Sequence, residues 1–114
     1  MRPRPVIPRV QAVQDIQDAV DIYFKAGADK AAMDFVNALE HAFAHIGRYP
    51  SSGSHRHARE LDLPGLRSWP VGRFPHLIFY LEREDHLDVW RILHGKRDLA
   101  AGLALPPGTE IIIV

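Results

Sequence analysis

The sequence predicts an α+β fold in which an antiparallel pair of helices packs on one face of an antiparallel sheet. Apolar residues recur every three or four positions between residues 13 and 46, which is typical of amphipathic helices. A short apolar stretch between prolines precedes them, and apolar stretches of strand length follow between residues 66 and 93. The predicted order is strand, helix, helix and three strands, and a chain of 114 residues forms one such domain.

The first predicted strand is short. Val6 and Ile7 lie between prolines, which donate no hydrogen bond to a neighbouring strand, so we expect them at a sheet edge. From Arg9 the apolar spacing becomes helical, and this first helix is expected to end at Gly27.

The second helix is predicted to begin near Asp29 and to end at Gly47 and Pro50. A connection of only about three residues favours an antiparallel helical hairpin. The apolar positions of both helices and of the strands predict a core. Its expected members are Val13, Ile16, Val20, Phe35, Leu39, Phe43, Ile46, Ile78, Phe79 and Val89.

Three consecutive strands are predicted over residues 66–71, 77–81 and 87–93. The middle one is apolar at every position, as expected for a strand that is buried on both faces. Residues 72–75 and 82–86 form the connections, so the three strands make an antiparallel meander.

The last part of the chain is expected to be an extension, residues 100–114, beyond a domain of residues 1–99. Prolines and a glycine at positions 106–108 break any helix there. The final Ile-Ile-Ile-Val is prone to form a strand, so we expect residues 111–114 to dock on the sheet edge or on a partner.

Composition excludes several classes of protein. The chain has no cysteine, which removes disulfides, thiol nucleophiles and cysteine zinc sites. No apolar run approaches the length of a membrane span, and the formal net charge is zero. We therefore expect a cytoplasmic protein with no membrane contact and no direct binding of nucleic acid.

Neither cluster of histidines predicts a metal site. His41 and His45 have the i, i+4 spacing of helical ligands, but they lie opposite the apolar stripe, as expected for a solvated face. His55 and His57 flank one arginine and have no third ligand nearby. A phosphate-binding glycine loop and a nucleophile motif are also absent from the sequence. No cofactor, metal or catalytic residue is predicted.

Charge gathers where the last strand ends, at residues 94–98. Arg91 has two interpretations, an ion pair with Asp88 or Asp98 or a contact with a target. His94 closes the strand through the backbone or contacts a target. The candidate target-binding residues are Arg67, Arg73, Arg91, His94, Lys96 and Arg97.

An ordered set of short motifs resembles the RelE/ParE superfamily of type II toxin–antitoxin toxins, and within it the ParE branch, over roughly residues 5–99. The motifs are Asp15-Ile16, Tyr23, Phe35, Leu39, Tyr49-Pro50, Gly53, Pro64-Gly65-Leu66-Arg67, Gly72-Arg73-Phe74, Ile78-Phe79-Tyr80 and the segment from Arg91 to Asp98.

This resemblance implies a bacterial toxin that inhibits DNA gyrase by protein contact and is neutralised by a ParD-like antitoxin. The antitoxin would fold a disordered segment into an apolar groove of the toxin. The aromatic residues expected there are Tyr23, Phe24, Trp69 and Trp90.

Two alternatives stay open. The RelE branch of the same fold cleaves messenger RNA on the ribosome, which needs cations and an acid–base pair. Active relatives place a tyrosine after the histidine, where this chain has Gly95. The chain could instead be an inert binding module of the same fold. For a toxin, we expect Arg91→Ala or His94→Ala to lower toxicity without unfolding the domain.

Overall fold

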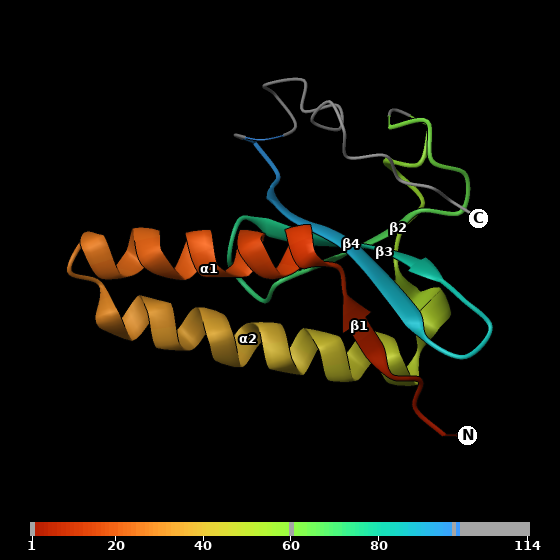
Figure 1. The fold of residues 1–114 in the computed structure, drawn as a ribbon, viewed down its shortest axis with the longest axis horizontal. Helices are drawn as coiled ribbons and strands as arrows, with labels where there is room; N and C mark the ends of the chain where they lie inside the picture. Colours follow the sequence, from red (N-terminus) through yellow and green to blue (C-terminus); the bar gives the residue numbers. More distant parts are fainter. Residues whose placement is uncertain (1, 60, 97, 99–114) are drawn as a thin grey trace.

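The computed structural model describes residues 2–59, 61–96 and 98, and it has the predicted order of elements (Figure 1). The tail at residues 111–114 lies outside the described residues. The elements are β1 (Val6–Pro8), α1 (Val10–Lys25), α2 (Asp29–Arg48), a 3₁₀ helix η1 (Pro50–Ser52), β2 (Arg67–Pro70), β3 (His76–Glu82) and β4 (Leu87–His94).

The four strands form one sheet in the order β1-β4-β3-β2. β2, β3 and β4 form the predicted antiparallel meander. β1, however, runs parallel to β4, with Val6 opposite Leu87, so the sheet is mixed and the prediction of an antiparallel sheet is corrected. The two helices carry the chain back across one face after β1, and this crossover allows the first strand to lie parallel to the last.

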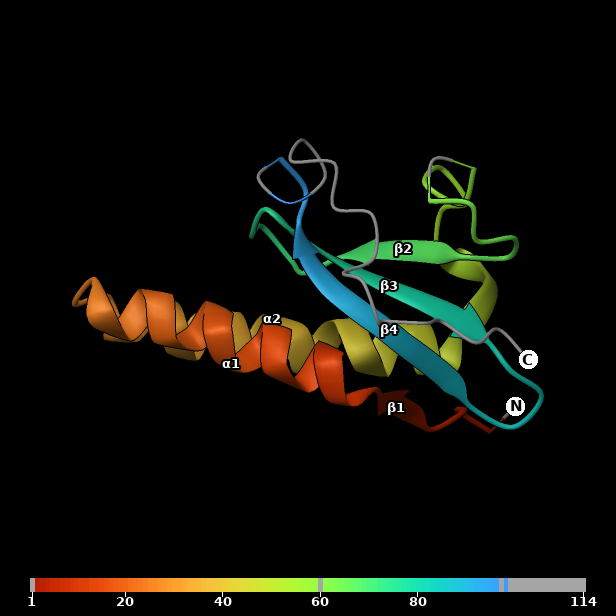
Figure 2. The same ribbon diagram turned by 45° about the horizontal axis from the view of Figure 1, so that its top comes forward.

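The helices lie along one face of the sheet (Figure 2), where apolar side chains of both layers form the main core. Of the predicted core, Ile16, Val20 and Phe43 are partly buried against this cluster. Val13 is 38% exposed, because the neighbouring Ala12 takes the inward position on α1. The remaining predicted core residues are buried, namely Phe35, Leu39, Ile46, Ile78, Phe79 and Val89.

The opposite face of the sheet carries a second apolar cluster. Its buried members are Leu63, Leu66, Phe79, Leu81, Trp90 and Leu93. The first two come from the segment before β2. Phe79 and Leu81 alternate along β3 with residues that face the helices, and Trp90 and Leu93 come from β4. The middle strand is therefore buried on both faces, as the sequence predicted.

α2 ends at Arg48, between Gly47 and Pro50, where the sequence predicted its end. The N-terminal segment crosses at this glycine, where the Arg4 amide donates to the Gly47 carbonyl at 2.8 Å. A Cβ on Gly47 would lie 2.8 Å from the Arg4 carbonyl oxygen, so only a glycine permits this approach.

Candidate interaction surfaces

The register of the sheet divides the predicted target-binding residues between its two ends. Arg67 begins β2 opposite Tyr80, near the β3–β4 turn. His94 ends β4 opposite His76, and the exposed Arg73 lies in the β2–β3 connection at that same end. The described candidates therefore do not share one surface.

Arg91 lies between these ends and points to α1. Its Nε and Nη2 donate to the two carboxylate oxygens of Asp15 at 2.7 and 2.9 Å, and the Ile92 amide donates to the same carboxylate at 3.0 Å. Only 9% of the Arg91 side chain and 8% of the Asp15 side chain is exposed. The ion-pair interpretation therefore holds, but the partner is Asp15 and not Asp88 or Asp98.

A β-bulge explains this orientation. Phe79 is paired with Arg91, whereas the next residue, Tyr80, is paired with Val89, so the register skips Trp90. Such an extra residue bends the strand and changes the direction of the side chains beside it. No local pattern in the sequence indicates this bulge. The pairing of Arg91 with Asp15 could therefore not be predicted from the sequence.

Asp88 has partners of its own. Arg9 holds both of its oxygens at 2.9 and 2.7 Å, and Arg83 adds a contact at 3.1 Å. Burial by itself raises the pKa of Asp88, but the hydrogen bonds from the two arginines outweigh it, so this pKa lies below its ordinary value. The cluster fastens β1 and the β3–β4 turn to the start of β4.

At the end of β4, the His94 amide donates to an Asp98 carboxylate oxygen at 2.7 Å. This bond involves the backbone of His94 and the side chain of Asp98, so the role of the His94 imidazole stays a prediction. The imidazole ring lies 5.4 Å from the ring of His76. Lys96 is exposed after the strand, and Arg97 lies outside the described residues.

The predicted aromatic residues also separate. Trp90 is only 1% exposed, so its side chain is not accessible to a partner in this structure. Tyr23 packs on Phe35 and Phe74 at ring distances of 6.0 and 5.7 Å. Phe24 is 46% exposed near the end of α1.

The fourth predicted aromatic residue, Trp69, lines a groove of about 310 Å³ between α2 and β2. The ring of His45 stacks on Trp69 at 4.3 Å and 17°, which gives this histidine a packing role. Within the described part of the chain, no three potential ligand side chains gather as a metal site would require. The groove is lined by Ala38, His41, Ala42, His45, Trp69, Pro70 and Gly72.

The sheet edge beside this groove offers few free backbone groups. Ser68 exchanges two backbone hydrogen bonds with Ser54, at 2.8 and 2.9 Å, and Pro70 has no N–H. A partner at this edge would therefore bind through side chains more than by adding a strand.

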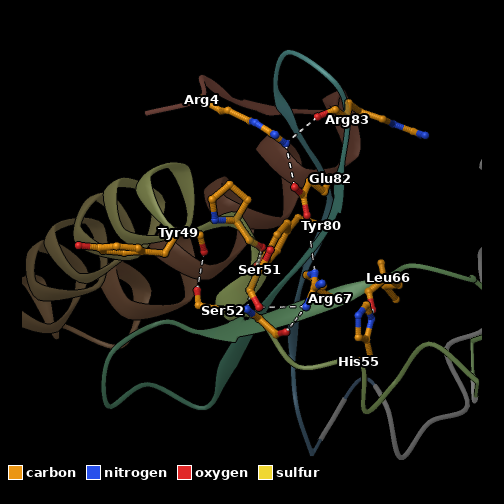
Figure 3. A network of polar contacts seen from close by, with 12 residues as sticks. Arg4, Tyr49, Ser51, Ser52, His55, Leu66, Arg67, Tyr80, Glu82 and Arg83 are labelled. Carbon is orange, nitrogen blue, oxygen red and sulfur yellow. Dashed lines mark hydrogen bonds and ion pairs between the residues drawn. The ribbon is translucent and has the colours of Figure 1, made fainter. Parts of the chain in front are cut away.

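Sequence reasoning missed a polar pocket around Arg67. Figure 3 shows Arg67 beside Tyr80, Glu82 and His55, with Arg4 reaching Glu82 from the other end of the chain. No local pattern could reveal this site, because Arg4 and Arg67 lie far apart in the sequence.

Comparison with known proteins identifies the family of this chain. The family model described as ParE toxin of type II toxin-antitoxin system, parDE, matches residues 6–99 of this chain. The chain belongs to this family. The match extends from β1 to just beyond β4, and it confirms the resemblance to the ParE branch.

The ParE fold is also supported by a solved structure. A chain described as the chromosomal ParDE TA system from P. aeruginosa is similar, with a TM-score of 0.66 and 16% sequence identity. The match covers 80% of this chain and 95% of that chain. No curated protein matches by sequence. Across residues 2–59, 61–96 and 98, neither helix combines the length and apolarity that a membrane span needs.

Proposed function

We propose that this ParE-family toxin inhibits DNA gyrase by protein contact and is neutralised by a ParD-like antitoxin. The family match over residues 6–99 carries the proposal, because it spans both helices and the whole sheet. The toxin would act in the cytoplasm as a binder of its target, with no reaction of its own.

The proposed target surface lies where β4 ends. Arg73 and Lys96 are exposed, and His94 is partly exposed at the same end of the sheet. Cations on exposed positions can steer a partner and contact its carboxylates or phosphates. Arg91 does not belong to this surface, because Asp15 occupies its guanidinium inside the fold.

The proposed antitoxin surface is the groove between α2 and β2. Its lining combines the small residues Ala38, Ala42 and Gly72 with the aromatic ring of Trp69. An apolar side chain of a folding segment would fit between them, as in other recognition of a peptide by a groove. Tyr49, which is 56% exposed, lies beyond His45 at a ring distance of 5.3 Å.

A plasmid-cleavage assay tests the action on gyrase. Purified gyrase, ATP, plasmid and antitoxin-free protein are incubated, and linear DNA trapped as a covalent gyrase complex is measured. Linear DNA above the gyrase-only control is expected, and added antitoxin should abolish it. No linear DNA from a folded sample would contradict the proposal.

The ribonuclease alternative has less support. Its chemistry needs accessible cations and proton-transfer groups around a phosphate. Arg91 is buried in an ion pair, and Gly95 provides only a backbone N–H, which donates to the Pro75 carbonyl at 2.8 Å. Cleavage of messenger RNA by the protein on translating ribosomes would restore this alternative.

A further inference from the structure

A polar pocket of about 490 Å³ lies at the end of the sheet opposite to Arg73 and His94. The N-terminal segment, the segment before β2, β3 and the β3–β4 turn contribute its lining. Figure 3 shows Arg4, His55, Arg67, Glu82 and Arg83 among these residues. Its lining combines three arginines and a histidine with two glutamates. The lining residues are Arg4, His55, Pro64, Gly65, Arg67, Leu81, Glu82, Arg83 and Glu84.

Arg67 is held ready for a ligand. Its Nη1 donates to the carbonyls of Ser51 and Gly53 at 3.1 and 2.9 Å, so the guanidinium plane is fixed by backbone. Its Nε lies 3.9 Å from Glu82, beyond hydrogen-bond distance. Because the side chain is already ordered, a ligand that binds the remaining N–H groups loses less conformational entropy.

Glu82 binds Arg4 closely and Arg67 only loosely. This one carboxylate receives Arg4 Nη1 at 2.9 Å and faces Arg67, so two cations share one anion. Arg83 is directed to another acid, Asp88, at 3.1 Å. Glu84 also lines the pocket, so the two remaining arginines and the two glutamates are equal in number there. An added anionic group would compete with Glu82 for Arg67, whose Nε lies 3.9 Å from that carboxylate.

His55 adds a further polar group at the rim. Its Nδ1 lies 3.1 Å from the Leu66 carbonyl oxygen, and because a carbonyl only accepts, Nδ1 must carry the hydrogen. This bond fixes the ring and leaves Nε2 available on the other side.

We propose that this pocket binds a carboxylate side chain from an acidic peptide segment of a partner protein. The planar fork of Arg67 suits a carboxylate. The exposed Pro64 offers apolar contact for the methylene groups of a glutamate. The pocket's own glutamates, Glu82 and Glu84, repel a doubly charged phosphate more strongly than a single carboxylate.

Titration of the ¹⁵N-labelled full chain with capped tetraglutamate peptide tests the proposal. Saturable NMR shifts are expected at Gly53, Gly65 and the Arg67 side-chain N–H. Capped tetraglutamine should produce no such shifts. Equal binding of the two peptides would overturn the proposal. Tighter binding of inorganic phosphate than of tetraglutamate at the same N–H groups would also overturn it.

Two variants change affinity in opposite directions. Arg67→Lys removes the fork and should weaken peptide binding about tenfold, the loss expected for one charge-assisted hydrogen bond. Glu82→Gln removes the charged carboxylate that competes with the peptide for Arg67, and it should strengthen peptide binding severalfold. Lys25→Arg, an exposed cation at the end of α1 and outside the pocket lining, is the control and should leave the affinity unchanged.

Glu82→Gln is decisive if the lysine variant does not fold, because a merely structural role for Glu82 predicts no gain in affinity. Unchanged or weaker binding by folded Glu82→Gln would overturn the proposal. The outcome is separate from the gyrase assay, since peptide binding is measured without gyrase or antitoxin.

Discussion

Arg91 on β4 and Asp15 on α1 form a two-point ion pair inside the fold, at 2.7 and 2.9 Å. The Asp15 carboxylate also receives the Ile92 amide, so it accepts three hydrogen bonds from one strand. Since both side chains are less than a tenth exposed, the pair fastens the first helix to the last strand and is shielded from water.

Arg91→Ala should therefore destabilise the domain. The change leaves the Asp15 charge buried without its main partner, and we expect a loss of about 3–5 kcal/mol in the free energy of unfolding. Urea denaturation followed by circular dichroism measures it. This result would replace the sequence-based expectation that the variant stays folded.

Asp18→Ala is the control for this pair, because Asp18 is exposed on the same helix and accepts a hydrogen bond from the exposed Gln14 side chain at 2.8 Å. Its stability should change by less than about 0.5 kcal/mol. An Arg91→Ala variant of unchanged stability that has lost toxicity would instead support a direct target contact.

Asp88 should make stability depend on pH. Its pKa in the folded state lies below that of the unfolded chain, about 3.9, so its contribution is complete above that value. As pH falls through the folded pKa, the carboxylate gains a proton and the contribution is lost. Asp88→Asn should therefore lower stability at pH 7 and make the decline between pH 5 and pH 2 less steep.

Denaturant unfolding at a series of pH values measures this effect. Asp34→Asn is a suitable control, because Asp34 pairs with Lys30 on an exposed helix surface. A decline of equal steepness in wild type and Asp88→Asn would show that other carboxylates cause the acid sensitivity.

Gly53 should tolerate no side chain, because the Tyr80 hydroxyl occupies the space where a Cβ would lie. The Gly53 amide donates to this hydroxyl at 3.1 Å, and the hydroxyl donates to the Pro50 carbonyl at 2.8 Å. Gly53→Ala should cost about 1–3 kcal/mol through overpacking. Thermal unfolding with a known enthalpy gives the value.

Gly95→Ala is the matched glycine control and should cost less stability than Gly53→Ala. A Cβ on Gly95 would lie 3.4 Å from the Pro75 carbonyl oxygen, which is an ordinary van der Waals distance. Adding Tyr80→Phe to Gly53→Ala should recover part of the loss, because the clashing oxygen is removed. Fully additive effects of the two changes would contradict the steric explanation.

Trp69→Ala should weaken antitoxin binding by about 30-fold or more, the usual effect of losing a central aromatic contact. Calorimetric titration of the folded variant with the ParD-like antitoxin measures the loss, and inhibition of gyrase should persist. Phe24→Ala, an exposed aromatic residue on α1, should bind normally. Normal binding by Trp69→Ala and weak binding by Phe24→Ala would place the antitoxin elsewhere.

Arg73→Ala with Lys96→Ala should reduce the linear DNA formed by gyrase without lowering stability. Both side chains are exposed and removing them exposes no buried charge. Arg48→Ala, an exposed cation at the end of α2, is the control and should inhibit gyrase normally. Full activity of the double variant would exclude this end of the sheet as the target surface.

The sequence by itself determined the order of elements and the family. Helical spacing up to residue 46 and strand-length apolar runs after residue 66 are local signals, because each depends on residues a few positions apart. The short motifs likewise sufficed for the ParE resemblance.

Only the tertiary structure decided which distant residues meet. The parallel pairing of β1 with β4 and the bulge at Trp90 are not encoded in local spacing. The bulge coincides with the turn of Arg91 to Asp15, and the crossover of the chain brings Arg4 to the pocket of Arg67. Side chains of one type can lie on a surface or in a buried ion pair, and only long-range contacts decide between the two.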